Sequence, residues 1–123
     1  LGQPDVQIGV NVNAKRINET LFEVELILTA TAKVEEKILF VAELSYVGLM
    51  SATNISDKNI QPLMMIEGPR LLFPFARAIM SDTTRDGGFL PLNLNPIDFV
   101  ALYRNNVSDT EEKRENKSNL SSK

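Results

Sequence analysis

The side chains of this chain that could do chemistry are its carboxylates, because the sequence contains no Cys and no His. Their absence excludes a thiolate nucleophile, a disulfide framework, the usual zinc ligand sets and an imidazole general base. Paired carboxylates occur, for example Glu23 with Glu25 and Glu35 with Glu36. Glu23 and Glu25 alternate with apolar residues, which predicts that they lie on the exposed face of a sheet. Exposed carboxyl groups are not expected to have shifted pKa values, so we predict no catalytic residues and no enzyme.

The predicted exposed face has a second interpretation besides a simple solvated surface. Its acidic residues surround two exposed apolar side chains, and such a combination could dock a basic partner. The acidic residues of this plane are Asp5, Glu23, Glu25 and Glu43, and the apolar side chains inside it are Ile27 and Val41.

Two other charged patterns point to ions, and both have a simpler interpretation. Residues 82–87 approach a calcium-loop pattern, but its third position is Thr84 and its twelfth is Asn93, where a bidentate Glu is needed. A turn that ends a helix is therefore predicted there, and no metal site.

Arg70 and Arg77 could bind phosphate, but no Gly-rich loop follows a strand to assist them. Ion pairs with neighbouring carboxylates are expected instead.

The composition is that of one small globular domain. The 123 residues are 43% hydrophobic, and the net charge is −3. A nucleic-acid partner is not expected without a basic excess, and membrane insertion is not expected without a long apolar run. The lack of Cys fits a reducing compartment, which indicates a cytoplasmic location. Because the chain begins with Leu1 and Pro4 already stands at a strand entrance, we expect further residues upstream.

Hydrophobic periodicity predicts an α+β fold. Apolar and polar residues alternate over residues 4–18, 21–33 and 36–47, which indicates three long strands. Their short connections predict an antiparallel meander. The period then changes, and a short helix is predicted over residues 60–66 with Gly68 at its C′ position.

Two more helices are predicted before the composition shifts. Residues 69–82 are apolar around most of the helix, more than a lone domain of this size can cover. Residues 96–106 follow Asn95 as the N-cap, and this helix has two apolar sides. We therefore define a domain over residues 1–106 and predict a disordered tail over residues 107–123, where Ser, Asn, Glu and Lys dominate.

These predicted helices carry a recognisable series of motifs: EGPRLLFPFAR at 67–77, RDGGF at 85–89, PLNL at 91–94 and PIDFVALY at 96–103. The series closely resembles the SecB family of bacterial protein-export chaperones, and the resemblance extends over residues 4–106. It implies a four-stranded antiparallel sheet, whose first strand is expected upstream of this chain, with helices packed on one face. It also implies a homotetramer built as a dimer of dimers. The implied activity is to hold unfolded precursor proteins competent for translocation and to deliver them to the SecA motor ATPase, with no cofactor.

The resemblance and the periodicity together suggest three surfaces. The predicted client-binding groove consists of Val6, Ile8, Val10, Phe99, Leu102 and Tyr103, although each of these could instead be an ordinary core residue. The predicted motor-docking surface is Val41 and Glu43, which match the family surface, extended by alternation to Glu23 and Glu25. The predicted oligomer interface is Ala42, Leu44, Leu72, Phe75 and Ile79.

Three other functions remain open from the sequence. A small enzyme or ligand-binding domain would need a deep pocket around a charged cluster. A purely structural assembly subunit would form the same oligomer without affinity for unfolded chains. A SecB-like chaperone of a toxin–antitoxin system would share the fold.

Overall fold

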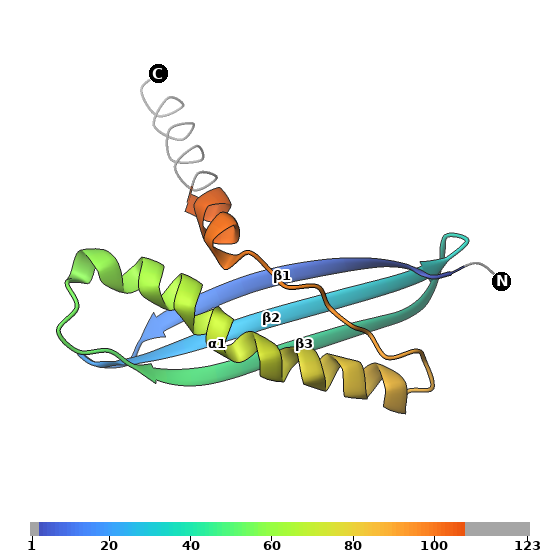
Figure 1. Ribbon diagram of the computed structural model, residues 1–123, viewed down its shortest axis with the longest axis horizontal. Coiled ribbons are helices and arrows are strands. Elements are labelled where there is room, and N and C mark those ends of the chain that lie inside the picture. The colour runs from blue at the N-terminus through green and yellow to red at the C-terminus, as the bar shows by residue number, and fades with distance from the viewer. Residues whose placement is uncertain (1–2, 108–123) are drawn as a thin grey trace, which may run out of the picture.

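A computed structural model describes residues 3–107, and its centre is an open antiparallel sheet of three strands (Figure 1). The strands are β1 (Asp5–Arg16), β2 (Leu21–Val34) and β3 (Lys37–Ser51), in the spatial order β1-β2-β3. The predicted meander is therefore confirmed. The fourth strand that the resemblance implies is not among the described residues.

Alternation along β2 determines which face of the sheet is buried. Every second side chain of this central strand, from Phe22 to Ala32, is buried, and those between them are only half-buried. β3 follows the same rule, with Phe40, Ala42 and Leu44 turned inward and the residues between them exposed. The predicted division of the sheet into one apolar face and one polar face is therefore confirmed. Successive side chains of a strand point to opposite faces, so an alternating sequence buries one face and exposes the other.

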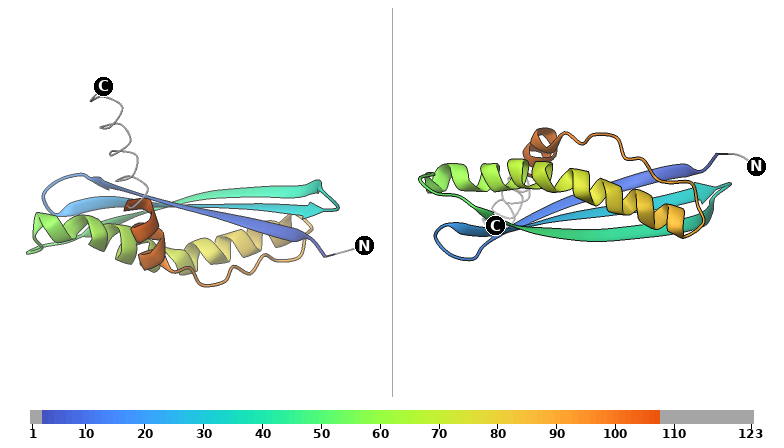
Figure 2. Two further views of the ribbon diagram at one scale, coloured as in Figure 1. Left: turned by 90° about the horizontal axis from the view of Figure 1, so that it is seen from above. Right: turned by 60° about the horizontal axis from the view of Figure 1, so that its bottom comes forward.

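One long helix, α1 (Asp57–Asp86), covers the apolar face of the sheet (Figure 2). The sequence predicted two helices separated at Gly68, and that division is wrong. Gly68 is buried inside α1, where a Cβ would stand 2.9 Å from two methyl carbons of Val24. This glycine allows the helix to approach β2 closely and does not end it.

The prolines of α1 do not interrupt the helix either, although each of them removes one backbone hydrogen bond. Pro62, Pro69 and Pro74 all lie inside the helix. A proline lacks the N–H that would bond to the carbonyl four residues earlier, so each leaves one such carbonyl without its helical partner. Packing of α1 along the sheet compensates for these losses, since most of helix stability in proteins comes from such packing.

After α1 the chain turns at Gly87 and Gly88 and returns as an extended strap over residues 89–98. The strap lies on the same side of the sheet as α1 and leads into a last helical segment over residues 99–107 (Figures 1 and 2). This segment begins later than predicted. Asp98 is its cap, because the Asp98 Oδ1 accepts the Ala101 N–H at 3.1 Å, so Asn95 and Pro96 belong to the strap.

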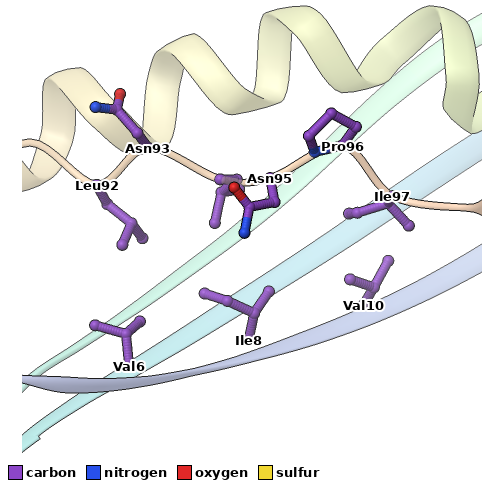
Figure 3. Close-up of a pocket in the computed structure, with 9 residues that line it drawn as sticks. Val6, Ile8, Val10, Leu92, Asn93, Asn95, Pro96 and Ile97 are labelled. Carbon is purple, nitrogen blue, oxygen red and sulfur yellow. The ribbon is translucent and has the colours of Figure 1, made fainter.

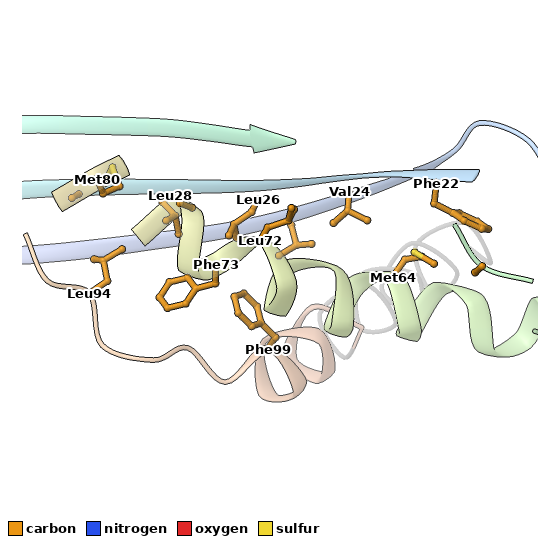
Figure 4. Packing of buried hydrophobic residues seen from close by; sticks show 14 of the residues in the cluster. Phe22, Val24, Leu26, Leu28, Met64, Leu72, Phe73, Met80, Leu94 and Phe99 are labelled. Carbon is orange, nitrogen blue, oxygen red and sulfur yellow. The ribbon is translucent and has the colours of Figure 1, made fainter. Parts of the chain in front are cut away.

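The core lies between the sheet and these helical elements (Figure 4). Phe73 of α1 and Phe99 of the last helical segment meet edge to face, with ring centroids 6.0 Å apart. Leu94 of the strap is buried in the same cluster. The predicted tail over residues 107–123 lies, except for Val107, outside the described residues. Within the described part of the chain, no helix is long and apolar enough to cross a membrane.

Candidate client-binding groove and neighbouring surfaces

An open cavity of about 530 Å³ lies between β1 and the strap (Figure 3). Val6, Ile8 and Val10 form one wall, and residues 92–97 form the other. Alternation explains the first wall, because these three side chains share the face of β1 that is turned toward α1. β1 is an edge strand, so α1 covers its apolar residues less completely, and Ile8 remains 41% exposed.

A second cavity, of about 460 Å³, continues the first toward the start of β1. The two cavities share Val6, Leu92 and Asn93, so they form one groove. The walls of the second cavity are mainly apolar, and the rings of Phe40 and Phe89 meet there with centroids 4.7 Å apart. We call the combined space the β1–strap groove.

The structure brings only half of the predicted groove residues to this groove. Val6, Ile8 and Val10 line it, whereas Phe99 is buried in the core against Phe73. Leu102 and Tyr103 are half-buried on the last helical segment and do not line either cavity.

Sequence reasoning missed the residues of the opposite wall. Residues 89–93 are predicted from the sequence as a short extended link, and the alternation of Leu90, Leu92 and Leu94 could also have indicated that one side of this link faces the sheet. Leu94 is buried, Leu92 is half-buried and Leu90 is exposed.

The predicted motor-docking residues lie on the opposite face of the sheet, in two separate groups. Glu43 is paired with Thr29, and Val41 beside it is 61% exposed. Glu25 lies four residues from Thr29 along β2, which at about 3.3 Å per residue is about 13 Å. Glu23 lies two residues farther along. The four residues share a face but do not form one contiguous contact.

Glu25 departs from the expectation that exposed carboxyl groups have ordinary pKa values. Hydrogen bonds from the Ser45 hydroxyl and then from the Asn13 amide, the latter at 3.1 Å, lower the pKa of Glu25. Both bonds stabilise the ionised form. A lowered pKa does not favour acid–base catalysis, because it keeps the Glu25 carboxylate charged at neutral pH.

The predicted oligomer residues are divided between the core and the surface. Leu72 is buried against Gly48, and Ala42 and Leu44 are half-buried on the inner face of β3. Phe75 and Ile79 are exposed, and Leu71 belongs to the same stripe at four-residue spacing. We call Leu71, Phe75 and Ile79 the α1 stripe.

The other charged patterns resolve as local contacts. Arg70 pairs with Glu67 at 2.6 Å, which confirms the ion pairing expected for it, whereas Arg77 forms no ion pair with the carboxylates of residues 3–107. Residues 82–86 are part of α1, where Asp82 pairs with Arg85 at 3.2 Å. Among residues 3–107, no group of three or more acidic side chains gathers to hold a metal ion.

Comparison with known proteins gives the family. The model of the SecB family, described as preprotein translocase subunit SecB, matches residues 1–110. A protein-export protein SecB of Methylocella silvestris is 52% identical over 85% of this chain and 65% of its own length. That of Rhodospirillum rubrum is 49% identical, over 86% and 66%. That of Afipia carboxidovorans is 47% identical, over 95% and 73%.

A solved structure shares the fold. A SecB-like chaperone of Mycobacterium tuberculosis, in complex with a ChAD peptide from the HigA1 antitoxin, superposes with a TM-score of 0.59 at 16% identity. The match covers 76% of this chain and 71% of that one. The present chain spans about two thirds of the length of the first curated relatives. The sequence matches and the α+β architecture together show that this chain belongs to the SecB family.

Proposed function

We propose that this chain is a molecular chaperone that binds unfolded precursor proteins and keeps them competent for export. The observation that carries the proposal is the β1–strap groove, which is open, mainly apolar and longer than a single side-chain pocket. Relatives named protein-export proteins, at 47–52% identity, support the same activity.

The groove fits a client that is extended and variable in sequence. Burial of apolar surface is non-directional, so a groove lined by Val6, Ile8 and Leu92 can accept many side chains. Each client side chain that becomes fully buried would contribute about 1.5–3 kcal/mol before ordering costs. Binding of unfolded chains shifts the folding equilibrium of the client away from the native state by mass action.

We further propose a homotetramer built as a dimer of dimers, with the α1 stripe at an interface between copies. Phe75 is 61% exposed although it is large and apolar, and its ring stacks on Tyr46, with centroids 6.3 Å apart. A second copy would cover this surface. Several grooves in one assembly would raise the overall affinity for a long client.

The outer face of the sheet is the proposed contact for the SecA motor ATPase in the cytoplasm. Val41 and Glu43 combine an exposed apolar side chain with a carboxylate, which suits a basic and apolar segment. Glu23 and Glu25 offer a second acidic contact farther along the sheet. No cofactor and no covalent step are part of this proposal.

A titration of the chain with a denatured client tests the chaperone function. Ile8→Glu places a charge on the β1 wall of the first cavity and is expected to weaken binding by at least tenfold, since a desolvated carboxylate opposes apolar contacts. Ile38→Glu is the matched control, because Ile38 is a strand residue that is 62% exposed and lies outside the groove. Normal oligomers without any client binding would favour the purely structural assembly subunit instead.

A toxin–antitoxin chaperone is the second candidate, since the solved structure with the same fold holds an antitoxin peptide. The two candidates differ in selectivity. An export chaperone is expected to bind several unrelated unfolded chains with similar affinity, and their mutual competition would be complete. Tight binding of one antitoxin segment, without competition by unfolded precursors, would favour the second candidate.

A further inference from the structure

Thr84 is the only polar residue that is buried among residues 3–107, with 3% of its surface exposed. It lies in the last turn of α1. A valine of nearly the same volume would fill this site, so packing alone does not require a hydroxyl group. The hydrogen bonds of that hydroxyl explain its presence, because a buried polar group is costly unless it is bonded.

The Thr84 hydroxyl connects the end of α1 to the strap. Its Oγ1 lies 3.0 Å from the carbonyl oxygens of both Met80 and Ser81, so its single hydrogen is donated to this pair. The same oxygen accepts the Leu92 N–H at 3.0 Å. Because the Thr84 hydroxyl donates its hydrogen to the helix carbonyls, its orientation is fixed. Its oxygen lone pair is then directed at the Leu92 N–H of the strap.

This bond acts at the wall of the β1–strap groove. Leu92 lines both cavities of the groove, opposite Val6 (Figure 3). Within the described structure, the Leu92 N–H is the only backbone group of residues 90–97 that makes a hydrogen bond. Burial of Leu94 holds the strap onto the core, but apolar contact does not fix its position along or across the sheet as a hydrogen bond does.

We propose that Thr84 is a positioning residue for client binding: its hydroxyl fixes Leu92 and thereby sets the width of the β1–strap groove. This inference rests on the proposed function of the groove.

Three variants of the full chain test the inference: Thr84→Val, Thr84→Ser and Thr83→Val. Thr84→Val keeps the volume and removes the acceptor of Leu92, whereas Thr84→Ser keeps the hydroxyl. Thr83→Val is the control, because Thr83 is exposed on the same turn. The probe is a fluorescein-labelled extended peptide with leucine at alternate positions, and hydrogen exchange of the Leu92 amide is measured in parallel.

Thr84→Val is expected to bind the probe about tenfold more weakly, since loss of one partner of a buried hydrogen bond costs a comparable factor. The Leu92 amide should exchange faster in the same variant. Thr84→Ser and Thr83→Val should match the parent in both measurements. Unchanged probe affinity in Thr84→Val overturns the proposal, even if thermal stability falls, because a merely structural threonine would lower stability alone. If the parent itself does not bind the probe, the proposed function fails, and accelerated Leu92 exchange would then support only the link between Thr84 and the strap.

Discussion

Gly68 of α1 lies directly against Val24 of β2, so that a Cβ on Gly68 would stand 2.9 Å from both Val24 methyl carbons. Val24 is fully buried. Gly68→Ala is therefore expected to lower the free energy of unfolding by about 1–2 kcal/mol, because overpacking outweighs the gain in helix propensity. Chemical denaturation measures this change.

A double-mutant cycle separates the contact from other effects of the alanine. In a Val24→Ala background, Gly68→Ala should be neutral or stabilising, since the methyl groups that it meets are gone. An equal loss of stability in both backgrounds would show that Gly68 serves another purpose than close approach of the helix to the sheet.

The prediction of two helices was wrong because local signals were given more weight than packing. Gly68 next to Pro69 is a strong local sign of a helix end, and only the position of Val24 across the interface shows another use for the glycine. By contrast, the strands were predicted to within a few residues. Their alternation is a local pattern that also states which face is buried, so local and tertiary preferences agree there.

Phe99 gives a prediction that distinguishes core from groove. Its ring is buried against Phe73, so Phe99→Ala should lower the free energy of unfolding by roughly 3–5 kcal/mol. Leu102→Ala should cost clearly less, because Leu102 is only half-buried. Urea denaturation of both variants measures the difference. A stable Phe99→Ala variant that no longer binds a denatured client would instead support the groove role that the sequence suggested.

The candidate groove was only partly predictable, because one of its walls depends on tertiary packing and not on a local sequence pattern. The β1 wall follows from alternation, but the wall at residues 92–97 depends on where the chain returns after α1. That path is determined by the turn at Gly88, by burial of Leu94 and by the bond from Leu92 to Thr84. The alternating leucines of the strap indicate an extended segment but not where that segment lies against the sheet, so the sequence prediction placed the second wall on the last helix instead.

The hydrogen bond from Ser45 to Glu25 predicts a dependence on pH. Ser45→Ala should raise the pKa of Glu25 toward the ordinary glutamate value, because the larger of its two stabilising hydrogen bonds is removed. A carboxyl group whose folded-state pKa is lowered adds stability above its unfolded pKa and loses it as pH falls through the folded pKa. The parent should therefore be more stable than Ser45→Ala at neutral pH, and the difference should vanish in acid below both values.

Titration of the Glu25 carboxyl resonance by NMR measures this directly. Ser45→Thr, which keeps a hydroxyl on the same strand position, is the matched control and should leave the titration near that of the parent. Asn13→Ala should raise the pKa of Glu25 by a smaller amount than Ser45→Ala, since the bond from Asn13 is the weaker cause. A larger rise of the Glu25 pKa in Asn13→Ala than in Ser45→Ala would contradict the conclusion that the bond from Ser45 is the stronger cause.

The α1 stripe predicts how assembly fails. Phe75→Glu should shift the assembly toward smaller species in light scattering, because a carboxylate in an apolar interface would be desolvated without a partner. Arg77→Glu is the control, since Arg77 lies on the polar side of the same helix. The fold should survive both changes, because both side chains are exposed. An unaltered mass for Phe75→Glu would show that the stripe is not an interface between copies.

The two acidic groups of the outer face predict different contributions to motor binding. Glu43→Lys reverses a charge beside the exposed Val41, so it should weaken binding of the SecA ATPase about tenfold and make the remaining binding less sensitive to salt. Glu25→Lys changes a site about 13 Å away along the sheet, and a smaller effect is expected unless the motor segment spans both groups. Calorimetry at two salt concentrations measures both variants, with Glu19→Lys in the β1–β2 turn as the control for charge alone. Equal losses for all three variants would mean that net charge, and not the outer face of the sheet, governs the interaction.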